Sequence, residues 1–163
     1  MFKLIVVCFF LIPSVWALLV VSSVTPKQVA RLDSTEITQR GDSKLLFALI
    51  SVESGGDDNA VGDLLLSNKA YGCLQIRQPA VDDYNRANNT FHKAEDCRGN
   101  RSLSVSICKW YLGHYATSKR LGRTPTDEDR ARIWNGGPNG HRKPSTESYW
   151  AKVKKALAKQ REG

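Results

Sequence analysis

One carboxylic acid in this sequence stands in a setting that suits acid catalysis. Glu53 follows the apolar segment 45–52 and precedes Ser54 and the glycine pair 55–56. Burial in apolar surroundings raises the pKa of a carboxyl group, and flexible glycines beside it leave space for a substrate. A protonated carboxyl group can give its proton to a poor leaving group, such as a glycosidic oxygen, as the bond breaks. Most glutamates at helix ends are solvated, so the surrounding motifs must decide whether Glu53 is a general acid.

Four short motifs accompany this glutamate in a fixed order. They are Val52–Gly56, Asn59–Asp63, Tyr71–Ile76 and Ile133–Gly137. Together they resemble the active-site region of soluble lytic transglycosylases and goose-type lysozymes, in which a Glu-Ser-Gly element is followed by a Gly-x-x-Gln-Ile element. The segment Thr146–Val153 is similar to the closing Thr-x-x-Tyr helix of these proteins.

The resemblance covers residues 45–157 and implies both a fold and an activity. The implied fold is lysozyme-like, α+β but mostly α, with a small irregular or hairpin region after the catalytic helix. The implied reaction cleaves the β-1,4 bond between N-acetylmuramic acid and N-acetylglucosamine in bacterial peptidoglycan, without a cofactor. Glu53 is then the acid, and the substrate-binding residues are Ser54, Tyr71, Gln75, Ile76, Asn135 and Tyr149. Cys73 and Gly136 depart from the family pattern, which more often has a small or apolar residue and an alanine there.

The number of available carboxylates bears on the mechanism. A glycosidase that inverts or retains usually needs a second carboxylate across the scissile bond. Asp63 and Asp82 are candidates, although aspartates in such segments are commonly turn or surface residues. Lytic transglycosylases work with one glutamate, because the substrate's N-acetyl group stabilises the cation and its own 6-hydroxyl attacks. We therefore expect transglycosylase chemistry, with a hydrolytic lysozyme (muramidase) as the alternative.

Other classes of function remain open alternatives. A lysozyme-like protein that has lost turnover would bind peptidoglycan or chitin, and a chitin hydrolase would use a similar groove. The formal charge of +8 indicates an acidic partner, which a wall polymer or an anionic membrane would provide. Nucleic acid is not expected, because no interleaving of aromatic and basic residues accompanies the charge. A membrane-disrupting protein would keep its killing activity after Glu53→Gln.

The N-terminal residues indicate export. Lys3 precedes an apolar run from Leu4 to Val21, so residues 1–23 are expected to be a signal peptide or an uncleaved N-terminal anchor. Residues 24–41 would be a leader segment and residues 42–160 the single catalytic domain. We expect a monomer that is secreted, or periplasmic in a Gram-negative host.

The cysteines and histidines predict no metal centre. Cys73, Cys97 and Cys108 remain after removal of the signal, so at most one intramolecular disulfide can form, and Cys97–Cys108 is the favoured pair. The three histidines are scattered, without the spacing of metal ligands: His92, His114 and His141.

The elements that must position these side chains are mostly helices. Periodic apolar residues, caps and glycine stops predict helices at 42–53, at 79–88, from 103 until Gly122 and Pro125, at 126–136, and from about 146 onward. The helical period is lost over 57–78, where turn signals predict loops and a small hairpin.

Overall fold

The computed structural model describes residues 42–160, most of which are helical. The helices are 42–54, α2 (Gln78–Asn88), α3 (Arg101–Tyr115), α4 (Ser118–Leu121), α5 (Asp127–Gly136) and α6 (Glu147–Lys159), and two short strands, β1 (Val61–Gly62) and β2 (Ala70–Tyr71), form a hairpin. The expected mostly helical α+β fold is confirmed. The predictions for 1–23 and 24–41 lie outside the described residues. Between residues 42 and 160, no helix is long and apolar enough to cross a membrane.

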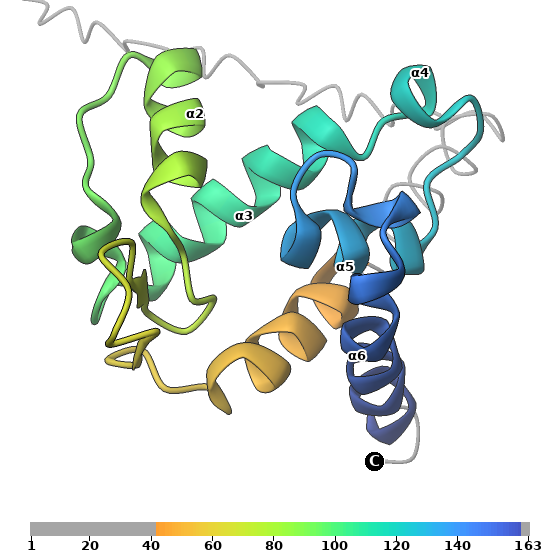
Figure 1. Ribbon diagram of the computed structural model, residues 1–163, viewed down its shortest axis with the longest axis horizontal. Helices are drawn as coiled ribbons and strands as arrows, with labels where there is room; N and C mark the ends of the chain where they lie inside the picture. The colour runs from red at the N-terminus through yellow and green to blue at the C-terminus, as the bar shows by residue number, and fades with distance from the viewer. Residues whose placement is uncertain (1–41, 161–163) are drawn as a thin grey trace, which may run out of the picture.

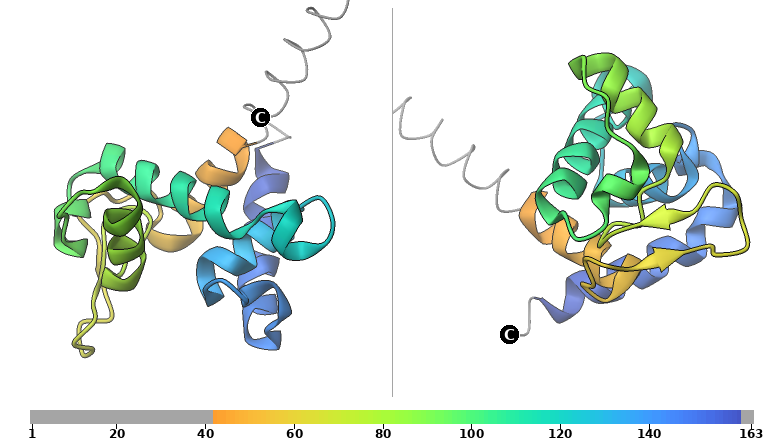
Figure 2. Two further views of the ribbon diagram at one scale, coloured as in Figure 1. Left: turned by 90° about the horizontal axis from the view of Figure 1, so that it is seen from above. Right: turned by 90° about the vertical axis from the view of Figure 1, so that its left-hand side faces the viewer.

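Helix α3 runs through the middle of the molecule and joins its two sides (Figure 1). The hairpin and α2 lie on one side, α5 and α6 lie on the other, and helix 42–54 passes between them at the bottom of this view. Seen from above, the hairpin and the α5–α6 side both extend from the same side of α3 (Figure 2). The fold therefore places the hairpin side and the α5–α6 side as two walls that face each other.

Apolar residues at helical spacing fill the core between these elements. Helix 42–54 buries Leu45 and Leu49, α3 buries Ile107, and α6 buries Val153 one turn after Tyr149. Each such side chain stabilises the fold by roughly 1.5–3 kcal/mol when fully buried. This packing fixes the end of helix 42–54, where Glu53 stands.

The predicted helix boundaries are confirmed except at one point. Thr126 and Asp129 form the expected capping box at the start of α5, with Asp129 N donating to Thr126 Oγ1 at 3.2 Å. The helix expected to run from Leu103 to Gly122 is divided instead into α3 and α4. Thr117 causes the division, because its hydroxyl caps the new helix by accepting from Arg120 N at 3.3 Å.

The predicted disulfide between Cys97 and Cys108 does not form in the structure, which has both residues and Cys73 as buried free thiols. The side chain that α3 presents to Cys97 is Ser104, whose hydroxyl donates to the Cys97 carbonyl at 3.2 Å. Cys108 lies one helical turn farther along α3, toward Glu53. Burial raises the pKa of Cys97 to about 11, which disfavours its reactive thiolate form.

Candidate active site

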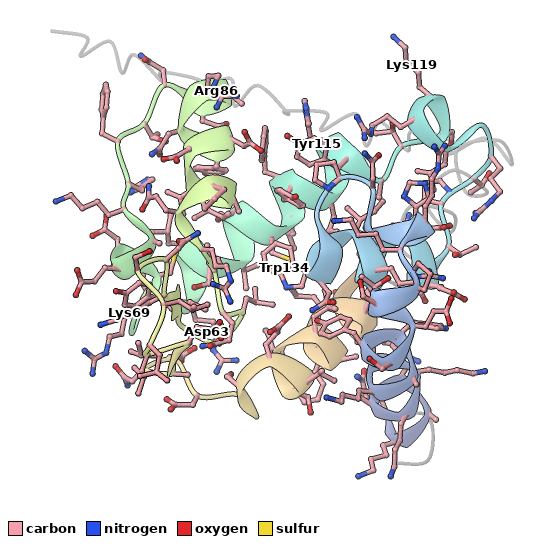
Figure 3. The ribbon with its side chains drawn as sticks, viewed as in Figure 1. Asp63, Lys69, Arg86, Tyr115, Lys119 and Trp134 are labelled. Atoms are coloured by element: carbon pink, nitrogen blue, oxygen red, sulfur yellow. The ribbon has the colours of Figure 1, made fainter. Side chains whose placement is uncertain are left out.

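A cleft of about 470 Å³ opens between the hairpin side and α5. Five of the residues singled out from the sequence line it, namely Glu53, Asp63, Gln75, Ile76 and Asn135. Figure 3 shows Asp63 on the hairpin side and Trp134 on the α5 side of this space. Residues from four separate segments therefore meet around one cavity, which is of a size found for ligand sites.

Glu53 is held at the cleft by a hydrogen bond from the last helix. The Tyr149 hydroxyl donates to Glu53 Oε1 at 2.7 Å. Desolvation by burial raises the pKa of Glu53, although hydrogen bonds from Tyr149 and Trp134 act in the opposite direction. The carboxyl group thus keeps its proton to a higher pH than an ordinary glutamate, as a general acid requires.

Tyr149 stands behind the acid and does not line the cleft. Its side chain is buried against the core, and burial, together with the neighbouring Glu53 carboxyl, raises the pKa of the phenol. The phenol therefore stays neutral and serves as a hydrogen-bond donor. We infer that Tyr149 fixes the direction of the Glu53 carboxyl group rather than contacting the substrate.

The opposite wall carries a charged pair. Asp63 pairs with Arg77, and Arg77 Nη1 also donates to the Asn68 carbonyl at 2.6 Å. The Asp63 side chain is 41% exposed, so this carboxylate lies in a far more solvated environment than Glu53. The two carboxyl groups share the cleft but differ in their burial and in their partners.

Two residues on this wall have left-handed backbone conformations. Asp63 has φ 53° and Gln75 has φ 49°, and both line the cleft. Gln75 Nε2 donates to the Gly72 carbonyl at 3.0 Å, and a Cβ at Gly62 would collide with the Gln75 side-chain oxygen. Strained backbone held by its surroundings is common at binding sites. Any larger residue at position 62 would therefore require the Gln75 side-chain amide to move.

Aromatic rings form the floor on the α5 side. Tyr111 of α3 packs edge-on against Trp134 of α5, with 5.7 Å between ring centroids and 87° between ring planes. Asn135 follows Trp134 and is exposed at the cleft. An aromatic surface with a few polar groups suits a sugar, whose ring has apolar faces and a polar rim.

Besides Tyr149, three predicted site residues lie outside the cleft lining. Ser54 is about 100° farther round its helix than Glu53, and its hydroxyl donates to the Cys73 carbonyl at 2.9 Å. Tyr71 exchanges backbone hydrogen bonds with Ile76, both at 2.9 Å. Asp82 is exposed on α2 and accepts from Gln78 Nε2 at 2.8 Å. The contacts of Ser54 and Tyr71 hold the loop that carries Gln75, whereas Asp82 is a helix-surface residue.

The cleft also contains residues that the sequence did not single out for the site, among them Arg77 and Tyr111. Trp134, which lines the cleft as well, belongs to the Ile133–Gly137 motif. Across residues 42–160, no group of three His, Cys, Asp or Glu side chains is placed to hold a metal ion.

Comparison with known proteins gives consistent matches. Residues 33–157 match the transglycosylase SLT domain family. A lysozyme of Ostrea edulis is 32% identical over 130 residues, covering 68% of this chain and 91% of that protein. A lysozyme of Magallana gigas is 33% identical over 86 residues, or 52% of this chain, and the chain spans 59% of its length.

Solved structures agree with the sequence matches. A crystal structure of Meretrix lusoria lysozyme in complex with Aeromonas hydrophila PliI gives a TM-score of 0.58 at 25% identity, covering 69% of this chain and 87% of that chain. The structural match confirms the lysozyme-like fold that the sequence motifs imply. The family match covers most of the chain, and it includes Glu53 and every other cleft residue named above. The chain belongs to the transglycosylase SLT domain family.

Proposed function

We propose that this protein is a glycosidase that cleaves the β-1,4 bond between N-acetylmuramic acid and N-acetylglucosamine in peptidoglycan, with Glu53 as its acid and base. One observation carries the proposal: a buried carboxyl group with a raised pKa, held by Tyr149, lines a cleft of about 470 Å³. The family match and the similarity to lysozymes support the choice of substrate.

The favoured reaction is a transglycosylation within one sugar. Protonated Glu53 gives its proton to the bridging oxygen as the bond from that oxygen to C1 breaks, and the N-acetyl group stabilises the positive charge at C1. The Glu53 carboxylate then accepts the proton of the 6-hydroxyl as its oxygen bonds to C1. Glu53 ends protonated, no water is consumed, and one product carries a 1,6-anhydro ring.

The pairing of Asp63 with Arg77 supports this single-carboxylate route. The Arg77 guanidinium already occupies the Asp63 carboxylate, which is therefore less available to contact water or the C1 atom of a sugar. A hydrolytic lysozyme is the second candidate, since Asp63 lies in the same cleft as Glu53 and the similar proteins named above are lysozymes. In that route Asp63 would activate water or stabilise the cation.

Mass spectrometry of the products from purified peptidoglycan tests the proposal. Anhydro-ended fragments, one water lighter than reducing-ended ones, are expected from the wild type and absent with Glu53→Gln. Reducing ends alone would overturn the transglycosylase route in favour of the lysozyme. Binding without any cleavage by the wild type would identify a peptidoglycan- or chitin-binding protein and overturn the enzymatic proposal.

We also propose that the protein acts outside the cytoplasm as a monomer, because its substrate lies there and residues 1–23 have the composition of a signal peptide. N-terminal sequencing of the exported protein and its mass in solution test these two points.

A further inference from the structure

A second groove lies between helix 42–54 and α6, on a different face of the helix that carries Glu53. It has a volume of about 440 Å³ and shares no lining residue with the cleft. The two helices lie side by side at the bottom of Figure 1. Gln160 Nε2 donates to the Lys44 carbonyl at 3.2 Å, which joins the end of α6 to the start of helix 42–54.

Three lysines gather on the α6 side of this groove. Lys152, Lys155 and Lys159 follow one another at intervals of three and four, which places them on one face of α6, and no carboxylate lines the groove with them. No ion pair within residues 42–160 involves any of the three. Like charges at this spacing repel one another, so the groove presents positive charge that an anionic ligand would neutralise.

An exposed aromatic ring lies beside the lysines. The Phe47 side chain of helix 42–54 lines the groove and is 60% exposed. A phenyl ring in this position offers a flat apolar surface, which the apolar face of a sugar ring can cover. Ser51 and Gln160, which also line the groove, supply hydroxyl and amide groups for hydrogen bonds to sugar hydroxyls.

We propose that this groove is a second binding site for peptidoglycan, which holds a part of the polymer that lies outside the cleft. A sugar ring packs on Phe47, and the carboxylates of the stem peptides pair with Lys152, Lys155 and Lys159. The substrate identity rests on the proposed function. An anionic polymer without sugar rings would use the lysines but not Phe47, and a flat membrane would contact convex side chains rather than a groove.

The consequence of such a site is retention on the polymer. A second contact makes rebinding of the cleft an intramolecular event after each cut, which raises the apparent affinity for an extended substrate without changing the cleft. Short glycans, which cannot reach both sites, gain nothing from the groove. The effect of groove variants should therefore depend on the size of the substrate.

Binding to insoluble purified peptidoglycan, measured with Glu53→Gln as the parent to prevent cleavage, tests the proposal. K152Q/K155Q/K159Q is expected to bind about tenfold more weakly, because one of two linked contacts is lost. K109Q/K119Q/K154Q removes the same charge from lysines outside the groove and is expected to bind within about twofold of the parent, since that charge acts only at long range. Phe47→Ala is expected to weaken binding without a change in charge, whereas Phe47→Trp retains it.

A second test changes the polymer instead of the protein, by amidation of its peptide carboxylates. The parent is then expected to bind as weakly as the groove lysine variant, and the lysine substitutions should have no further effect. Equal losses in the two triple-lysine variants would show non-specific attraction and overturn the proposal. Unchanged binding by Phe47→Ala would also overturn it. Dimers in solution that the groove variant dissociates would identify a second copy of the chain as the occupant.

The proposed function can fail independently of this inference. The variants with intact Glu53 are assayed on a short soluble glycan, on which the groove variants are expected to match the wild type. Absence of cleavage by the wild type would contradict the catalytic proposal and leave the binding measurements valid. Normal cleavage by the wild type together with unchanged polymer binding by the groove variants would overturn only the proposal of a second binding site. Thermal unfolding of each variant shows that it is folded.

Discussion

The two walls of the cleft present carboxyl groups in opposite conditions. On the side of α5 and α6, Glu53 is buried and its pKa is raised, and the two residues that hydrogen-bond to it there, Tyr149 and Trp134, are uncharged. On the hairpin side, Asp63 is half-exposed and paired with Arg77. Glu53 on one wall can therefore act as a proton donor, whereas the carboxylate of Asp63 on the other wall is already paired with a cation.

This difference comes from the elements that build each wall. Helices 42–54, α5 and α6 pack around a shared apolar core, which desolvates whatever lies at their edge. The hairpin is short, and residues 63–68 between its strands are exposed, so this wall offers turns, charges and amide groups. A reaction that needs one proton donor and several hydrogen-bonding groups can draw on both walls without a second buried acid.

Removing the proton donor from the helical wall should have the largest effect on activity. Glu53→Gln keeps the shape of the side chain but cannot protonate the leaving oxygen, so kcat is expected to fall by about 10³-fold. Release of soluble fragments from peptidoglycan measures the loss. Thermal unfolding is the control, and a variant that remains folded and retains appreciable activity would show that Glu53 is not the acid.

Removing the phenol behind the acid should have the next largest effect. In Tyr149→Phe the carboxyl group loses its orienting hydrogen bond, and kcat is expected to fall about tenfold. That bond lowers the pKa of Glu53, so its loss raises the pKa further. Glu53 then stays protonated to higher pH, and the alkaline limb of the pH–rate profile moves upward. An unmoved limb would reduce Tyr149 to a packing role.

A substitution of Asp63 on the hairpin wall should lower kcat less, if a single carboxylate is enough for catalysis. Asp63→Asn removes the partner of Arg77 but leaves Glu53 in place, and kcat is expected to fall less than about tenfold, well short of the loss of an essential carboxylate. The same products should form, with anhydro ends. A loss as large as that of Glu53→Gln would instead assign Asp63 to a hydrolytic mechanism.

The smallest expected effect concerns the support of the helical wall. Burial raises the pKa of Asp129, but hydrogen bonds from Arg123 and from Thr126 outweigh it and lower that pKa to about 2. The charged form is therefore favoured by folding. Asp129→Asn is expected to lower the free energy of unfolding by about 1–2 kcal/mol near neutral pH.

The pH dependence of that loss follows from the sign of the shift. Because the folded pKa of Asp129 lies below the unfolded one, its contribution is complete above about pH 4 and disappears as the pH falls towards 2. Denaturant unfolding of Asp129→Asn and the wild type should thus converge in acid. A difference that persists at pH 2 would point to lost packing rather than lost charge.

Local sequence predicted what depends on local structure. The helix ending at Glu53 and the capping box at Thr126 follow from patterns within a few residues, and the structure has both. Arg77 and Tyr111 were not predicted for the site, because their positions depend on contacts with Asp63 and Trp134 that form only when distant segments meet.

Residue type and closeness in sequence did not predict which side chains face each other in the structure. Cys97 and Cys108 are near in sequence, but one turn of α3 separates Cys108 from the side chain that faces Cys97. Ser54 adjoins Glu53 in the chain, yet it points to the Cys73 carbonyl because successive helix residues face different directions. Sequence motifs identified the neighbourhood of the site but not the direction of each side chain.

The bond between Glu53 and Tyr149 joins residues that are 96 positions apart. A ribosome that has just finished helix 42–54 has yet to translate α6, which will support the Glu53 carboxyl group. In the growing polypeptide, Glu53 therefore lacks the hydrogen bond from Tyr149 until α6 emerges and docks. Premature termination before Tyr149 would leave a product in which Glu53 has no phenol behind it, so full activity requires synthesis at least as far as Tyr149.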